Sequence, residues 1–206
     1  MAISIPDRVV VFDYGEVISR SQSEQDRLEL LGIAGREADE FWPVYWRHRD
    51  ELDHGTLSIV DYWRRLAADL GAAWDLTTIQ RLWAADFRSW ISVDPATVRI
   101  LEELHDGGTR IALLSNAGFD FGDPFRYAPF GTLFERVFVS AELGLLKPDA
   151  EVYRRIAREL GIEPDRMVFI DNKPVNVEGA TALGVTGHVF TDAHGLREFL
   201  VSLQEH

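Results

Sequence analysis

The sequence predicts an α/β protein, a doubly wound parallel sheet with an inserted α-helical segment. Short apolar runs rich in β-branched residues, long enough for strands buried on both faces, recur along the chain. After residue 90 these runs alternate with amphipathic helical segments, which is the pattern of a parallel sheet. From residue 19 to residue 90 the pattern is helical throughout. We therefore expect residues 1–18 and 91–206 to form an α/β core, and residues 19–90 to form a helical cap inserted into it.

The core is predicted to contain five strands, the first of which is the VVVF run at 9–12. Its first helix has clear boundaries, because Asp94 is a good N-cap, Pro95 suits the first helical position and Gly107 suits the end. Between residues 119 and 134 five phenylalanines cluster with two prolines, and we expect a packed loop there. The other predicted strands are 110–114, 136–139, 167–170 and 185–190, and the other predicted helices are 149–160, 175–183 and 195–204.

The cap is predicted to contain four helices. Gly32 and Gly71 each follow an apolar-periodic run and are expected to end a helix. Ser58 and Thr77 each precede an acid or an amide by three residues, which is the spacing of a capping box. Pro43 is expected in the first turn of its helix or at a kink. The predicted helices are 22–31, 37–50, 58–70 and 78–89.

All six tryptophans lie in the cap. A bundle of about 70 residues has little interior, so we expect most of these large side chains to fill it. The cap also holds Arg47 and Arg49, which could contact an anion, although arginines on a helix are more often solvated. The tryptophans are Trp42, Trp46, Trp63, Trp74, Trp83 and Trp90.

The composition restricts the partners. A formal net charge of −13 argues against binding to nucleic acid or to an anionic membrane, both of which need a basic surface. Without cysteine the chain has no disulfide, thiol nucleophile or zinc–thiolate site. The amino terminus lacks the basic segment and apolar run of a signal peptide, and no apolar run approaches the length of a membrane span. We therefore expect a cytoplasmic protein, monomeric or homodimeric, without nucleic-acid or membrane partners.

Polar residues follow the first two predicted strands, at the edge where open α/β sheets bind their ligands. Asp13 follows the first strand, and Gly15 comes two residues later. Ser115 and Asn116 follow the second strand. A hydroxyl group and backbone amides that open a turn can cradle an anion there.

Two later stretches extend this pattern. Lys147, in the stretch GLLKPD, stands just before a helix, with a proline that fixes the turn. The fourth strand ends in Asp171 and Asn172. Because the carboxyl ends of parallel strands meet at one edge of a sheet, Asp171 could share a magnesium ion with Asp13. Magnesium prefers few carboxylates together with water and phosphate oxygens.

Together and in this order, the four stretches resemble the signatures of the haloacid dehalogenase superfamily: an aspartate nucleophile, a Ser or Thr, a Lys and an acidic pair. The resemblance covers the whole chain, and the helical insertion stands where that family has its cap. Within the superfamily, FDYGEVI and FIDNKPVNVEGA look most like the sugar-phosphate phosphatases that include glucose-1-phosphate phosphatases. The resemblance implies a Mg²⁺-dependent hydrolase of a small phosphorylated metabolite.

The resemblance also implies a role for each matched residue. Asp13 is expected to attack phosphorus and to form an aspartyl-phosphate. Ser115 and the backbone amide of Asn116 are expected to hold the phosphoryl oxygens. Lys147 is expected to neutralise charge between the phosphate and Asp13. The expected Mg²⁺ ligands are Asp13, the backbone carbonyl of Gly15, Asp171 and Asn172.

Two positions depart from the family pattern. Gly15 stands where the family usually has an aspartate that acts as general acid, and losing such an acid typically costs about 10²- to 10⁴-fold in rate. Water or Glu16 would then have to donate the proton. Asn172 stands where the family usually has an acidic metal ligand, so we expect weaker Mg²⁺ binding, and Asp171 could take over that role.

These departures leave two alternatives open. One is a 2-haloacid dehalogenase that forms an ester on Asp13, since true dehalogenases also lack the general acid and need no magnesium. Against it, that group has a hydroxylated residue where Asp171 stands and a tyrosine where Gly15 stands. The other alternative is a non-catalytic sugar-phosphate-binding protein.

Overall fold

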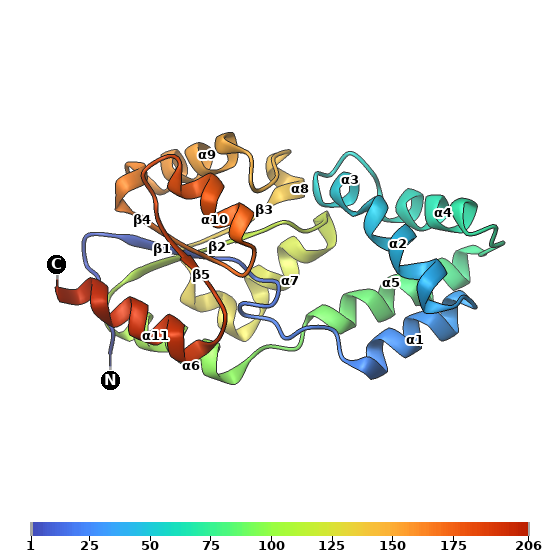
Figure 1. The fold of residues 1–206 in the computed structure, drawn as a ribbon, viewed down its shortest axis with the longest axis horizontal. Helices are drawn as coiled ribbons and strands as arrows, with labels where there is room; N and C mark the ends of the chain where they lie inside the picture. The colour runs from blue at the N-terminus through green and yellow to red at the C-terminus, as the bar shows by residue number, and fades with distance from the viewer. Residues whose placement is uncertain (1, 206) are drawn as a thin grey trace.

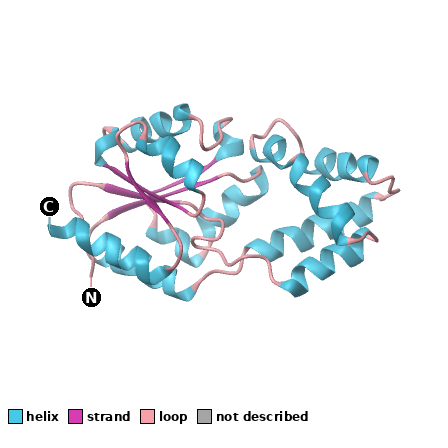
Figure 2. Ribbon diagram, in the orientation of Figure 1, coloured by secondary structure: helices cyan, strands magenta, loops and turns pink. Residues whose placement is uncertain are grey.

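A computed structural model describes residues 2–205, which form a helix-covered sheet and a separate group of helices beside it (Figures 1 and 2). The sheet has the order β3–β2–β1–β4–β5, and every neighbouring pair is parallel. The predicted doubly wound parallel sheet is therefore confirmed. Because β1 lies in the middle, the residue that follows it stands at the centre of one sheet edge. The strands are β1 (Val9–Phe12), β2 (Arg110–Ser115), β3 (Arg136–Val139), β4 (Met167–Asp171) and β5 (Thr186–Val189).

Helices cover both faces of the sheet (Figure 1). Val10 and Phe12 point into one hydrophobic cluster, with side chains of α6, α7 and α11. Val9 and Val11 point into a second cluster, with side chains of α9 and α10. Burial on both faces explains why every position of β1 is apolar. The core helices are α6 (Pro95–Asp106), α7 (Gly122–Tyr127), α8 (Ser140–Leu143), α9 (Ala150–Leu160), α10 (Pro174–Thr181) and α11 (Ala193–Ser202), with 3₁₀ turns η1 (Phe119–Phe121), η2 (Pro129–Leu133), η3 (Pro164–Arg166) and η4 (Leu203–Glu205).

The remaining helices lie between β1 and α6 and have a hydrophobic cluster of their own. Two chain segments, one after β1 and one before α6, join these helices to the sheet, and they are hydrogen-bonded to each other. Arg20 N–H donates to the Ser92 carbonyl oxygen at 2.7 Å, and Asp94 N–H donates to the Ile18 carbonyl oxygen at 2.8 Å. We propose residues 19–90 as the cap, since both of its ends lie where these two segments pair. The cap helices are α1 (Glu24–Ala34), α2 (Ala38–Arg47), α3 (Arg49–Asp53), α4 (Ile59–Asp69) and α5 (Leu76–Trp90).

Several predicted boundaries in the cap are wrong. Helix α1 continues through Gly32 and ends at Gly35, which takes the left-handed conformation (φ 61°) that favours glycine. Helix α5 is capped by Asp75 rather than Thr77, because the Asp75 carboxylate accepts from the Thr78 N–H and so starts the helix two residues earlier. Other boundaries hold, such as the Ser58 cap of α4.

Two longer segments also differ from the prediction. The helix predicted at 37–50 is divided at His48 into α2 and α3, and Pro43 lies inside α2 rather than in its first turn. The loop predicted at 119–134 contains α7 between two 3₁₀ turns. Its phenylalanines anchor it, because Phe121 and Phe125 are buried in the core. None of the helices in residues 2–205 has the length and apolar character needed to cross a membrane.

A buried polar network accompanies the aromatic interior of the cap. Arg49 donates to Asp53 at 3.1 Å, to Asp86 at 3.1 Å and to the Tyr45 hydroxyl at 2.8 Å. The Tyr45 hydroxyl donates in turn to Asp86 at 2.6 Å. Arg49 is therefore buried and not solvated, contrary to the usual behaviour of arginines on a helix, because two carboxylates satisfy its charge. Arg47 is exposed and pairs with Asp69.

The tryptophans divide by position. Trp63 is 1% exposed and contacts the rings of Tyr62 and Trp74, at centroid distances of 5.1 and 6.4 Å. Trp46 is 51% exposed. Trp90 packs against the core rather than inside the cap. The expected filling of the cap interior is thus correct for Trp42, Trp63, Trp74 and Trp83.

Trp63→Ala should lower the free energy of unfolding by about 3 kcal/mol, because it removes a fully buried ring and leaves a cavity. Trp46→Ala is the matched control, since an exposed ring should cost about 0.5 kcal/mol or less. Denaturant unfolding of both variants measures the difference. Equal losses in the two variants would mean that the Trp63 ring does not hold the cap together.

Asp53 should make stability depend on pH. Burial raises the pKa of Asp53 to about 6; the Arg49 charge lowers it, whereas Asp86 and Asp50 add to the increase. The folded state therefore holds a proton that the unfolded state has lost between about pH 4 and 6. As the pH falls through this window, the wild type should gain on the order of 2 kcal/mol relative to Asp53→Asn.

Denaturant unfolding of wild type and Asp53→Asn at pH 7 and pH 4.5 measures this gain. Asp39→Asn, at an exposed position of α2, controls for the loss of one negative charge. A difference between wild type and Asp53→Asn that stays constant with pH would contradict the raised pKa.

Candidate active site

The ends of three neighbouring strands bring the predicted polar residues together. Asp13 directly follows β1, and its N–H donates to the Ile170 carbonyl oxygen at 2.8 Å, which ties it to β4. Ser115 is the last residue of β2, and Asp171 is the last residue of β4. Since β1 pairs with both of these strands in parallel, the three side chains share one edge of the sheet.

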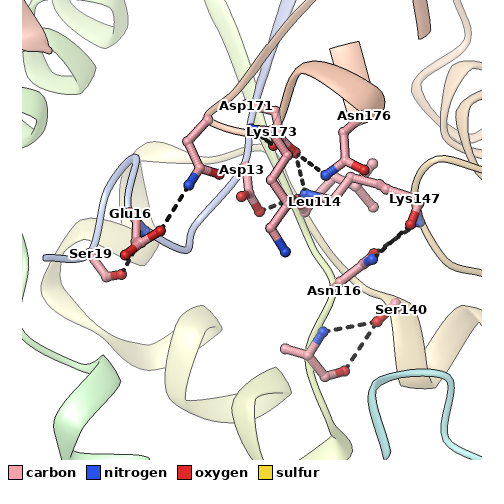
Figure 3. A network of polar contacts seen from close by, with 12 residues as sticks. Asp13, Glu16, Ser19, Leu114, Asn116, Ser140, Lys147, Asp171, Lys173 and Asn176 are labelled. Carbon is pink, nitrogen blue, oxygen red and sulfur yellow. Dashed lines mark hydrogen bonds and ion pairs between the residues drawn. The ribbon is translucent and has the colours of Figure 1, made fainter. Parts of the chain in front are cut away.

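A buried lysine joins two of these carboxylates (Figure 3). Lys147 Nζ lies 2.6 Å from Asp13 Oδ1 and 2.8 Å from Asp171 Oδ2. It also donates to the Leu114 carbonyl oxygen at 3.0 Å. An ammonium group has three protons, so these three acceptors use all of them. A lone lysine before a helix is often solvated, but the two carboxylates hold this one in the interior.

Burial and charge set the ionisation of this cluster. Burial raises the pKa of Asp13 to about 6; the Lys147 ammonium lowers it, and the Asp171 charge adds to the increase. For Lys147 burial acts against the charge, but Asp13 and Asp171 outweigh it and raise the pKa. Near neutral pH, Lys147 is thus a cation and Asp13 is mostly an anion that can serve as a nucleophile.

Asp171 accepts hydrogen bonds at both of its oxygens. Besides Lys147, Asn176 Nδ2 donates to Oδ2 at 2.9 Å, and the Lys173 backbone N–H donates to Oδ1 at 2.8 Å. Asp171 is fully buried. In this arrangement it orients Lys147 and the start of α10, and its expected part in binding a metal stays a prediction.

The two residues expected to bind phosphate play different parts. The Asn116 side chain donates to the Lys147 carbonyl oxygen and accepts from the Lys147 N–H, both at 3.0 Å, so it fixes the backbone of the lysine. The Asn116 backbone N–H makes no hydrogen bond within residues 2–205. The Ser115 hydroxyl lines the cavity described below and is likewise unpaired in the described chain. Two donors are therefore available beside Asp13.

Glu16 and Asn172 form a second contact between the strand ends. Glu16 has a positive φ of 59°, and its N–H donates to the Ser19 hydroxyl at 3.1 Å. Its carboxylate accepts from Asn172 Nδ2 at 3.0 Å and from the Ser21 hydroxyl at 2.7 Å. The Glu16 carboxylate therefore links the end of β1 to Asn172, and its part in proton donation stays a prediction.

A cavity of about 240 Å³ lies above Asp13, between the core and the cap. Its floor is polar and contains the strand-end residues. Its walls include aromatic side chains from both parts of the molecule, together with the Arg49 end of the cap network. The wall residues are Tyr14, Phe121 and Phe125 from the core, and Trp46, Arg49, Asp50, Asp53 and Trp90 from the cap.

Hydrogen bonds of side chains tie the cap to the core around this cavity. The Ser140 hydroxyl donates to the Asp53 carbonyl oxygen at 2.5 Å. Trp83 Nε1 donates to Asp120 Oδ2 at 2.8 Å. The first of these bonds ties α3, and with it Arg49, to the core.

The residues at the cavity floor fit a divalent cation. Asn172 Oδ1 is buried and has no partner among residues 2–205, because its amide nitrogen faces Glu16. An amide oxygen, one carboxylate and a backbone carbonyl, completed by water, make a suitable ligand set for Mg²⁺. Asp13, the Gly15 carbonyl and Asn172 would supply that set. Among residues 2–205, no group of three or more acidic or histidine side chains is placed to hold a metal ion. A metal at this site would therefore need backbone and amide ligands as well.

The charge of the cavity lining also favours a cation. Its carboxylates outnumber its cations, so an anionic substrate needs additional positive charge to enter. The carboxylates are Asp13, Glu16, Asp50 and Asp53, and the cations are Arg49, Lys147 and Lys173. Neither Lys173 nor the Glu16–Asn172 contact is predictable from a motif in the sequence, and the only signal for them is their place beside the strand-end motifs.

Comparison with known proteins identifies the family. The model of the haloacid dehalogenase-like hydrolases matches residues 8–184. The chain is 26% identical over 196 residues to flavin mononucleotide hydrolase 1 of Arabidopsis thaliana. The aligned residues cover 95% of this chain and 77% of the relative. It is 26% identical over 191 residues to the sesquiterpene phosphatase astK of Aspergillus oryzae, and the aligned residues cover 90% of this chain and 91% of the relative.

A solved structure shows the same fold. A HAD family enzyme of Bacteroides thetaiotaomicron, a mutant in complex with magnesium and inorganic phosphate, matches with a TM-score of 0.74 at 18% identity. The match covers 92% of this chain and 98% of that one. Since the family model spans most of the chain, the protein is an enzyme that belongs to the haloacid dehalogenase-like hydrolases.

Proposed function

We propose that the protein is a Mg²⁺-dependent phosphomonoester hydrolase that acts through an aspartyl-phosphate on Asp13. The observation that supports this most is the position of Asp13, on the floor of a cavity and held by the buried Lys147. The unpaired Ser115 hydroxyl and Asn116 N–H beside it are donors for phosphoryl oxygens. Both curated relatives are named as enzymes that act on phosphorylated compounds.

The reaction has two displacements at phosphorus. One Asp13 oxygen attacks phosphorus, and the bond between phosphorus and the leaving oxygen breaks while that oxygen takes a proton from water. A water molecule then attacks phosphorus, which releases inorganic phosphate and returns Asp13 as a carboxylate. Lys147 keeps Asp13 oriented throughout. The Ser115 and Asn116 donors stabilise the charge on the phosphoryl oxygens.

Magnesium bound by Asp13, the Gly15 carbonyl and Asn172 would reduce the repulsion between the anionic nucleophile and the anionic substrate. Asn172 contributes no charge, so we propose that Mg²⁺ binds more weakly than with an acid at that position. Glu16 holds the Asn172 amide so that its oxygen stays free for the cation.

The cavity supports a small substrate with an apolar or aromatic organic part. Its volume is below the roughly 300–1,000 Å³ of pockets for drug-sized ligands, and several of its walls are aromatic rings. The two relatives described above are named for a flavin nucleotide and a sesquiterpene, so the sugar-phosphate branch indicated by the sequence has less support than a phosphate ester of a flavin or an isoprenoid.

Hydrolysis of p-nitrophenyl phosphate should require magnesium and stop with excess chelator. Asp13→Asn should abolish turnover while the fold remains intact, because the amide has nearly the same shape but is no nucleophile. The measurement is release of nitrophenol, with circular dichroism of the variant as the control for folding. Chloride release from 2-chloropropionate, or turnover that is insensitive to chelator, would instead support the dehalogenase.

Gly15→Asp should raise the rate most for substrates with poor leaving groups. A Cβ at Gly15 meets no atom within 4 Å, and Gly15 is not among the residues with positive φ, so an aspartate fits. As a general acid it should add up to about 10²- to 10⁴-fold for alkyl phosphates and little for aryl phosphates. In the wild type, kcat/KM should therefore fall steeply as the pKa of the leaving group rises.

Gly15→Ala is the control, because it fills the same space without an acid. Rates of both variants over a series of aryl and alkyl phosphates give the dependence on the leaving group. A flat dependence in the wild type would show that another group already donates the proton.

A further inference from the structure

The chain contains only two lysines among its 21 basic residues, and both of them line the cavity. All other cations are arginines, of which Arg49 alone lines the same cavity. The two lysines differ in environment, because Lys147 is buried and Lys173 is exposed. The sequence resemblance gives a role to Lys147 only.

Without substrate, all three protons of the Lys147 ammonium group are in use. Its three donors are satisfied by Asp13, Asp171 and the Leu114 carbonyl oxygen. To contact a phosphoryl oxygen it has to exchange one of these bonds for the new one. Since carboxylates outnumber cations in the cavity lining, an anionic substrate still needs a further positive charge that faces it.

Lys173 meets this need. Its backbone is fixed, because its N–H donates to Asp171 Oδ1 and because Pro174 restricts it to an extended conformation (φ −94°, ψ 115°). Its side chain extends through the centre of the site in Figure 3, and no dashed line reaches its ammonium group. Lys173 Nζ has no hydrogen bond or ion pair in the described part of the chain, although the cavity contains several carboxylates.

We propose that Lys173 binds the phosphoryl group of the substrate and so adds a second cation to Lys147, which lies at the nucleophile. This inference rests on the proposed phosphatase function and adds to it the cation that contacts the substrate. Lys173 Nζ donates to a phosphoryl oxygen in both the bound substrate and the product phosphate. The neighbouring Asn172 is neutral, so Lys173 and the metal together supply the positive charge that faces the substrate.

Kinetics and phosphate inhibition test the contact directly. Lys173→Met should raise KM for p-nitrophenyl phosphate and the inhibition constant of inorganic phosphate by about 10- to 100-fold, the usual effect of losing a charged hydrogen bond. Because the contact exists before and after the chemical step, kcat should change much less. Lys173→Arg should recover part of the affinity.

Arg81→Met is the matched control, since it removes one exposed positive charge from the cap, outside the cavity lining. It should leave both constants unchanged. If Lys173→Met binds phosphate as tightly as the wild type, or if Arg81→Met weakens binding equally, the assignment of Lys173 is wrong and the phosphatase proposal still stands.

The rarity of lysine permits a second test that does not depend on activity. Reductive methylation should modify Lys173 readily and Lys147 slowly, because Lys147 is buried. Inorganic phosphate with magnesium should slow the methylation of Lys173 several-fold relative to chloride at the same ionic strength, as measured by mass spectrometry of the peptide. Unchanged methylation in a protein that hydrolyses phosphomonoesters would overturn the Lys173 contact alone. If neither hydrolysis nor protection is observed, both proposals fail.

Discussion

The ion cluster of Lys147 with two buried carboxylates is the interaction on which the site depends. It joins the end of β1, the end of β4 and the loop before α9, three segments far apart in sequence. Removing one partner from such a cluster leaves a buried charge uncompensated, at a cost of about 3–5 kcal/mol. The surrounding contacts serve the same cluster, since Asn116 fixes the backbone of Lys147, and Asn176 donates to the Asp171 oxygen that also accepts from Lys147. The floor of the cavity is thus preorganised before any substrate enters.

The cap follows a similar physical principle at a second place. Arg49 is buried with Asp53 and Asp86, and this network lies beside the aromatic cluster that gives the cap its interior. The network also reaches the cavity, because Arg49 and Asp53 line it opposite the strand ends. A hydrogen bond from Ser140 to the backbone of Asp53 couples the network to the core. Cap stability and substrate recognition are therefore expected to share residues, whereas the chemistry stays with the core.

The sequence allows prediction of the features that depend on local pattern. The five strands follow from apolar runs, and Asp13, Ser115 and Asp171 are predictable because they stand at strand ends, which topology alone brings together. The pattern does not decide between two nearby residues that both suit the end of a helix. Gly32 and Gly35 both suit the end of α1, and Asp75 and Thr77 both suit the N-cap of α5. The role of Lys173 cannot be read from sequence either. It depends on an ammonium group that lines the cavity without a partner in the described residues, which is visible only in the structure.

The central claim is that Asp13, held by Lys147, is the nucleophile at phosphorus. The most direct measurement is to quench the enzyme with acid during turnover of p-nitrophenyl phosphate, reduce it with borohydride, and analyse the peptide that contains residue 13 by mass spectrometry. An acyl phosphate on Asp13 is reduced to homoserine, and a free carboxylate is not. The account predicts homoserine at position 13 only when substrate and magnesium are both present. Sustained turnover with unmodified Asp13, or with the modification at another carboxylate, would contradict it.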